Sequence, residues 1–81
     1  MAVRPPLLGT FYRAPQPGAP PFVDVGDEVD RETVVGIVET MKMMTPVHAG
    51  VGGVVAEVRA VDGQFADADA VLVVVQPGGP A

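Results

Sequence analysis

The centre of this 81-residue chain reads Val38-Glu39-Thr40-Met41-Lys42-Met43-Met44-Thr45-Pro46-Val47. Lys42 is the only lysine in the sequence, and three of the four methionines lie within two residues of it. Methionine side chains are flexible and polarizable, so they offer an adaptable recognition surface. A lysine amine, unlike an arginine guanidinium, is a target of acylating enzymes. Two interpretations follow, a covalently modified lysine or a solvated surface lysine beside core methionines, and the flanking sequence decides between them.

The segments on either side of Lys42 are predicted to be strands that form a hairpin. Residues 33–40 lead up to Met41 and contain several β-branched side chains, which favour pleated, half-buried strands. Residues 43–49 run back, and Pro46 within them indicates an edge strand or a β-bulge, because proline cannot donate to a ladder. Two strands meeting at this point would hold the lysine amine exposed at the apex of a stiff hairpin.

The rest of the chain also predicts an all-β fold. Ten glycines and nine prolines leave only short uninterrupted stretches, and of these only residues 64–76 are long enough for an ordinary helix. That stretch contains the β-branched run at residues 70–75, which is typical of a buried strand. Further strands are expected at residues 7–12 and 22–25, with a connection over residues 29–32.

The second half of the chain repeats the first. Residues 26–30 recur 37 positions later as residues 63–67, and residues 34–38 recur at the same offset as residues 71–75. A repeat this short cannot bury its own apolar face, so the two copies must pack together. We therefore expect a flattened barrel or sandwich of two antiparallel sheets with an internal pseudo-two-fold repeat.

A proline-rich segment interrupts the first copy. Residues 9–12 match residues 53–56 at an offset of 44, which is seven more than the offset of the other matches. Residues 14–20 have this length, and their prolines cannot donate to a ladder. This segment is therefore predicted to be an insertion that protrudes from the sheets.

We expect the domain to span residues 6–76, with flexible termini at residues 1–5 and 77–81. The counterpart of residues 39–42 in the second copy is residues 76–79, expected to be frayed. One copy thus ends in a lysine-tipped hairpin, whereas the other ends the chain. An asymmetry at the tip of a symmetric scaffold favours a functional lysine.

Composition excludes several classes of function. With ten acidic and five basic side chains, the net charge is −5, whereas nucleic-acid binding usually needs a clustered basic face. No apolar run is long enough to span a bilayer, and the N-terminus lacks a signal peptide's hydrophobic core. The absence of cysteine excludes a disulfide framework and is consistent with a cytoplasmic protein. We expect neither a nucleic-acid nor a membrane partner.

The chain also lacks the usual catalytic side chains. It has no serine, cysteine or asparagine, and His48 is its only histidine. A Ser-His-Asp or Cys-His arrangement is therefore unavailable, and a zinc site would rest on His48 and carboxylates without the usual ligand spacing. We expect no catalytic residue and no metal, so any reaction involving this chain takes place in the active site of another protein.

Together, the repeat, the apex lysine and the insertion resemble the biotinyl domain of biotin carboxyl carrier proteins, of the acetyl-CoA carboxylase type. The resemblance covers about residues 6–75. Glu39-Thr40-Met41-Lys42-Met43 is similar to the biotinylation signature, Gly9-Thr10-Phe11-Tyr12-Arg13 to the opening strand, and residues 14–20 to the protruding thumb of this type.

The resemblance implies that a biotin protein ligase attaches biotin to Lys42 by an amide bond. The arm then visits a biotin carboxylase subunit and a carboxyltransferase subunit, which forms malonyl-CoA for fatty acid biosynthesis. Met41 and Met43 resemble the flanking methionines that handle the arm. Glu39 matches an acidic position before the hairpin, or is an ordinary cross-strand polar residue.

Three positions depart from the family pattern. Thr40 stands where alanine is commonest, a change that we expect the hairpin to tolerate. Glu32 stands where a turn glycine is frequent, which suggests a different turn conformation. Residues 14–20 contain no serine or threonine, so a hydrogen bond from the thumb to biotin would come from the backbone or Gln16. Met44 is expected to pack rather than to recognise the arm.

Other functions remain open from the sequence. A lipoyl carrier of a 2-oxo acid dehydrogenase is a second candidate, although lipoyl domains usually place Asp before and Ala after the lysine, where this chain has Met41 and Met43. A β-sandwich interaction module that is never modified is a third. A biotin carrier of another acyl-CoA carboxylase also fits, since the carrier does not select the acceptor. The chain could be a standalone short carrier or a fragment of a longer one.

Overall fold

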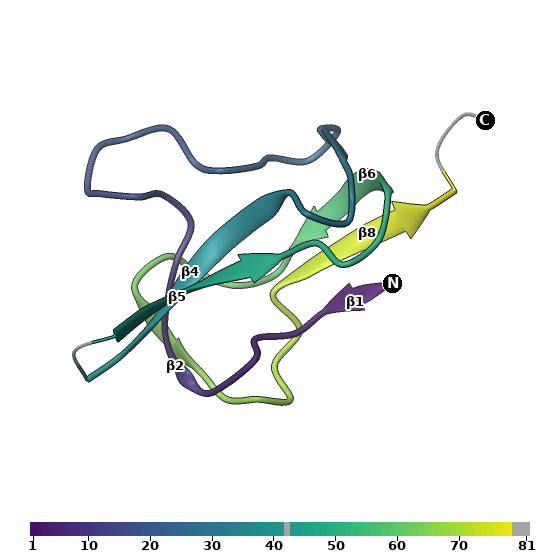
Figure 1. The fold of residues 1–81 in the computed structure, drawn as a ribbon. Coiled ribbons are helices and arrows are strands. Elements are labelled where there is room, and N and C mark those ends of the chain that lie inside the picture. Colours follow the sequence, from purple (N-terminus) through teal and green to yellow (C-terminus); the bar gives the residue numbers. More distant parts are fainter. Residues whose placement is uncertain (42, 79–81) are drawn as a thin grey trace.

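The structure is a computed structural model that describes residues 1–41 and 43–78. In these residues it contains eight strands and no helix (Figure 1). The strands are β1 (Ala2–Val3), β2 (Gly9–Tyr12), β3 (Glu28–Val29), β4 (Val34–Thr40), β5 (Met43–His48), β6 (Gly53–Val58), β7 (Gln64–Ala66) and β8 (Val73–Pro77). The predicted all-β class is confirmed.

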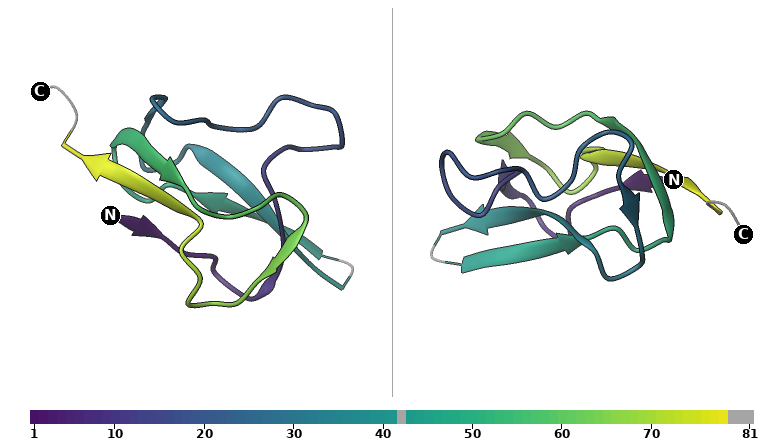
Figure 2. Two further views of the ribbon diagram at one scale, coloured as in Figure 1. Left: turned by 180° about the vertical axis from the view of Figure 1, so that it is seen from behind. Right: turned by 90° about the horizontal axis from the view of Figure 1, so that it is seen from above.

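The strands form two four-stranded antiparallel sheets, ordered β1-β8-β6-β3 and β5-β4-β2-β7. The two sheets face each other as the layers of a flattened sandwich (Figures 1 and 2). The free end of the β4–β5 hairpin lies at one end of the molecule, and Met1 and the last residues of β8 lie at the other. The predicted sandwich is therefore confirmed.

Strand pairing confirms the internal pseudo-two-fold repeat. If β1 to β4 are matched with β5 to β8, the order of the first sheet becomes the order of the second. The register matches too, since Thr10 pairs with Glu39 as Val54 pairs with Gln76. Each sheet takes two strands from each copy, so neither copy forms a sheet alone. The two residues between β4 and β5 are the junction of the copies.

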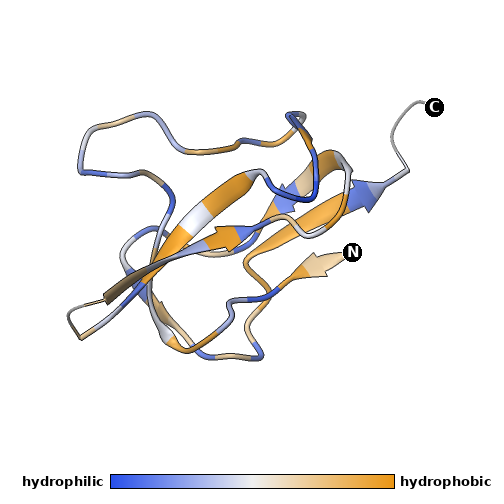
Figure 3. Cartoon of the chain, viewed as in Figure 1, coloured by the Kyte–Doolittle hydropathy of each residue, from blue (hydrophilic) through white to orange (hydrophobic). Residues whose placement is uncertain are grey.

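The core is built by equivalent positions of both copies. Phe11 and Val55 are each 1% exposed, and their strand partners Val38 and Val75 are fully buried. Figure 3 shows hydrophobic residues concentrated along β4, β6 and β8. The other buried apolar residues are Val3, Val23, Val29, Val35, Val47, Ala49, Ala66, Leu72 and Val73. Buried and exposed positions thus alternate along the strands, and the apolar face of each sheet packs against the other sheet.

Two local predictions in the first copy were wrong. Residues 22–25 do not form a strand, because the Phe22 N–H returns to the Arg13 carbonyl at 2.7 Å and closes the base of the proline-rich loop. The strand forms later, at Glu28–Val29, and overlaps the start of the connection expected over residues 29–32. Loop closure here outweighs the alternating pattern.

The ends of the domain also differ from the sequence boundaries. The expected domain excludes residues 1–5, yet β1 pairs with β8 and Val3 is buried. β8 continues to Pro77, so the expected fraying at Gln76 is not observed and both residues pair with β6. The second copy therefore remains paired as far as its last described strand residue.

The turn at Glu32 needs no glycine. The Asp30 carboxylate accepts hydrogen bonds from the Glu32 N–H at 2.8 Å and the Thr33 hydroxyl at 3.2 Å. The second copy uses the same device, because Asp67 accepts from the Asp69 N–H at 3.0 Å. Such a side chain stabilises the turn without a positive φ. The Asp30 side chain therefore stabilises a turn in which Glu32 replaces the frequent glycine.

A close approach of two strands makes a testable prediction about packing. A methyl group at Gly36 on β4 would overlap the ring of Phe11, which is buried and cannot move aside. We expect Gly36→Ala to destabilise the fold by about 2 kcal/mol, a fall of roughly 10 °C in Tm for a domain of this size. Thermal unfolding followed by circular dichroism measures it.

The matched control is Gly52→Ala, because a methyl group at Gly52 meets no atom closer than 3.8 Å and its φ is not positive. We expect its Tm to stay within about 3 °C of that of the unchanged protein. Equal melting temperatures for the two variants would contradict the overlap at Gly36.

Candidate functional site

The β4–β5 hairpin ends in a loop of two residues. Thr40 pairs with Met43, and only Met41 and Lys42 lie between them. Met41 has a φ of +54°, the one non-glycine residue with positive φ in the described chain. A positive φ at the first of two loop residues is typical of the primed turns that match strand twist. Lys42 itself lies outside the described residues.

The methionines around the loop are exposed. The exposed fraction is 95% for Met41, 68% for Met43 and 54% for Met44. Large apolar side chains presented to solvent at one tip form an adaptable contact surface. The interpretation of core methionines beside a surface lysine is thus excluded, and the expectation that Met44 is a packing residue was wrong.

Glu39 lies on the outer face of its sheet. It pairs with Thr10 on β2 and with Met44 on β5, and directly paired residues share a face. Phe65 on β7 extends the row, since it pairs with Thr10 and is 66% exposed. The structure therefore brings Glu39 close to the tip, as a half-buried residue that faces away from the core.

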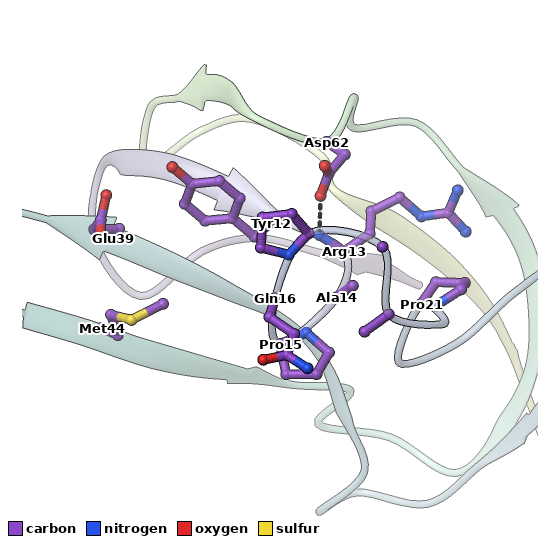
Figure 4. A pocket seen from close by; sticks show the side chains of 12 residues that line it. Tyr12, Arg13, Ala14, Pro15, Gln16, Pro21, Glu39, Met44 and Asp62 are labelled. Atoms are coloured by element: carbon purple, nitrogen blue, oxygen red, sulfur yellow. Dashed lines mark hydrogen bonds between the residues drawn. The ribbon is translucent and has the colours of Figure 1, made fainter.

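A groove runs beside this row, under the proline-rich loop. Its volume is about 480 Å³, and Figure 4 shows Tyr12 from β2 and Glu39 and Met44 from the hairpin facing the loop across it. The remaining lining residues are Arg13, Ala14, Pro15, Gln16, Pro17, Gly18, Ala19, Pro21 and Asp62. Gln16 supplies the one side-chain amide in this lining. No local sequence pattern indicated that Tyr12, Met44 and Asp62 would belong to this site.

A hydroxyl fixes the base of the hairpin loop. Thr40 Oγ1 donates to the Leu8 carbonyl at 2.6 Å, which ties the end of β4 to the residue before β2. Gly9 lies beside this bond, and a methyl group there would overlap the Glu39 carbonyl oxygen. Thr40 is therefore more than a tolerated replacement for alanine, because it holds the loop to its neighbouring strand.

Catalytic groups do not gather near the hairpin. His48 is exposed on β5, and within residues 1–41 and 43–78 no three His, Cys, Asp or Glu side chains are placed to bind one metal ion. None of the described residues belongs to a helix able to cross a membrane.

Comparisons with known proteins agree with this geometry. A family model described as "Biotin-requiring enzyme" matches residues 1–75. The chain is 47% identical over 75 residues to biotin carboxyl carrier protein of acetyl-CoA carboxylase 1, chloroplastic, of Arabidopsis thaliana, covering 93% of this chain and 27% of the relative.

Bacterial proteins of the same name are also similar. The chain is 55% identical over 58 residues to the biotin carboxyl carrier protein of acetyl-CoA carboxylase of Chlamydia muridarum, covering 72% of this chain and 36% of the relative. It is 43% identical over 74 residues to that of Haemophilus influenzae, covering 91% and 48%. The chain thus spans between a quarter and a half of these relatives' length.

The Thr40 hydroxyl makes a prediction about the tip. We expect Thr40→Val to lower the free energy of unfolding by about 1 kcal/mol, because the hydrogen bond to Leu8 is lost while the shape is kept. Urea denaturation measures the change. Thr45→Val on the same hairpin is the control, since the Thr45 hydroxyl makes no hydrogen bond within the part of the chain that the structure describes. A loss of equal size in both variants would count against the bond.

The left-handed backbone of Met41 leads to a second prediction about the tip. A left-handed conformation costs most L-residues about 1 kcal/mol, whereas asparagine adopts it more readily. We expect Met41→Asn to raise the free energy of unfolding by about 0.5 kcal/mol. Met43→Asn should lower it, because asparagine is disfavoured in strands. Urea denaturation of both variants tests the contrast, and changes of the same sign would refute it.

Proposed function

The chain belongs to the family of biotin-requiring enzymes, and from this membership we propose that it is the biotin carboxyl carrier of an acetyl-CoA carboxylase, with biotin attached covalently to Lys42. The observation that carries the proposal is the place of Lys42 in the sequence. It is the second of the two residues that separate β4 from β5 in the sequence, and its sequence neighbours Met41 and Met43 are exposed.

The surroundings of Lys42 fit an attached biotin arm. The adjacent methionine side chains project into solvent, so a modifying enzyme can reach this end of the hairpin without unfolding it. The paired strands β4 and β5 hold the loop on a rigid support. Met41 and Met43 then contact the arm or the enzyme that acts on it, and Glu39 lies beside Met44 on the outer surface of the sheet.

The proposal assigns each chemical step to another protein, because the sequence lacks the usual catalytic side chains. Biotin supplies the ureido nitrogen that accepts a carboxyl group and gives it up again. A biotin protein ligase attaches the cofactor, and biotin carboxylase and carboxyltransferase subunits perform the two half-reactions that form malonyl-CoA for fatty acid biosynthesis. The chain acts as a non-catalytic carrier. Its benefit is that a tether raises the effective concentration of the arm at both active sites.

Attachment also changes the charge at the tip. An amide at Lys42 removes the only lysine cation of the chain, taking the formal net charge from −5 to one unit more negative. The arm then lacks a charge that would pair with surface carboxylates. A neutral arm is therefore freer to leave the carrier surface and enter an active site.

The alternatives are less well supported. The flanking residues Met41 and Met43 argue against a lipoyl carrier, and the similar proteins reported above are named as biotin carriers of acetyl-CoA carboxylase. Transfer to another acyl-CoA stays compatible with the site, since the carrier does not select the acceptor. The exact bounds of the carrier domain and a cytoplasmic location remain predictions.

The experiment that tests the function is the intact mass of the full chain after co-expression with an active biotin protein ligase. We expect one biotin adduct per chain, and none in Lys42→Arg, because a guanidinium is not acylated. Lys42→Arg should unfold at the same temperature as the unchanged chain, which serves as the folding control. A lipoyl adduct, no adduct, or an adduct that persists in Lys42→Arg would overturn the proposal.

A further inference from the structure

The thumb, residues 14–20, is held to the sandwich by contacts of its flanking residue Arg13. The Arg13 carbonyl accepts the Phe22 N–H at 2.7 Å, which joins the two ends of the thumb. The Arg13 guanidinium donates to the Val23 carbonyl at 3.1 Å and pairs with Asp24 at 3.5 Å. The direction in which the thumb leaves β2 therefore depends on how Arg13 is held.

Asp62 holds Arg13 from the other copy of the repeat. The Arg13 N–H donates to Asp62 Oδ1 at 2.6 Å, the dashed line in Figure 4. Asp62 lies in the turn before β7, and that turn is itself fixed because the Gly63 N–H donates to the Phe11 carbonyl at 2.7 Å. The thumb of the first copy is thus anchored to a docked turn of the second. A hydrogen bond to a carboxylate is stronger than one between neutral groups.

The pseudo-symmetry shows that this anchor belongs to the thumb. Gly26 and Val55 repeat the contact of Gly63 with Phe11, at 2.8 Å, so the turn docks in both copies. The counterpart of Asp62, 37 positions earlier, is Val25, which has no carboxylate. The strand on which the Val25 turn docks is β6 of the second copy, and it continues past the equivalent point to Val58 without an insertion. The carboxylate is present only where a thumb has to be held.

We propose that Asp62 is a positioning residue, which fixes the thumb through Arg13 and so sets the groove between the thumb and the hairpin residues Glu39 and Met44. The inference rests on the proposed function, since that groove lies beside the loop that contains Lys42. An enzyme that docks on the tip meets the thumb in a fixed position. Without Asp62 the thumb must be ordered during docking, and ordering costs affinity.

The test compares Asp62→Ala, which removes the acceptor, with Asp62→Asn, which keeps Oδ1. The control is Asp67→Ala, because Asp67 also accepts one backbone N–H from an exposed turn but lies outside the groove. Initial rates of biotin transfer by a biotin protein ligase are measured on the full chain at varied carrier concentration. Thermal unfolding confirms that each variant folds.

We expect Asp62→Ala to raise the KM for the carrier roughly fivefold, with kcat within about twofold, as for the loss of one charge-assisted hydrogen bond. Asp62→Asn and Asp67→Ala should stay within about twofold of the unchanged chain in both constants. A purely structural role would lower stability and leave KM alone.

Amide hydrogen exchange reports the thumb directly. In Asp62→Ala, exchange should accelerate about tenfold at Ala19, whose N–H donates within the thumb, and at Phe22, whose N–H closes its base. Exchange at Gly26 should stay constant. An unchanged KM, unchanged exchange in the thumb, or an Asp62→Asn variant that behaves as Asp62→Ala would overturn the inference. Failure of the proposed function looks different, since the unchanged chain would then take up no biotin at all.

Discussion

The exchange of strands between the two copies of the repeat is the constraint on which the structure depends. Each sheet combines two strands of each copy, so the backbone hydrogen bonds of one copy are completed only by the other. The buried side chains Phe11, Val38, Val55 and Val75 close the space between the sheets from equivalent positions. A chain of 81 residues has a small core, and this mutual pairing completes the sheets that neither copy could form alone.

The same constraint creates the end of the molecule to which we assign the function. The junction of the two copies must cross from β4 to β5 in two residues, and this short connection gives the loop its left-handed Met41. The pseudo-equivalent pair, β8 with β1, has no such connection through the tip. The two-residue connection between β4 and β5 therefore breaks the symmetry of the scaffold, and the exposed methionines and the Thr40 hydrogen bond to Leu8 lie at this end.

The thumb is the second departure from symmetry, and it is integrated rather than appended. Its ends meet at Arg13, and Arg13 is joined to Asp62 of the opposite copy. The groove under the thumb combines residues of β2, the hairpin and the β6–β7 turn. Residues far apart in the sequence thus act on the same side of the tip, although no local pattern links them.

The sequence by itself determined the fold class, the repeat, the insertion and the hairpin around Lys42, because these depend on the periodicity and the spacing of residues along the chain. It misplaced the strand at residues 22–25 and missed β1 and Asp62. Only the tertiary structure decided these, since loop closure through Arg13 and cross-copy hydrogen bonds join residues without a shared local pattern. Exposure of Met44 likewise follows from its strand partner Glu39 rather than from its hydropathy.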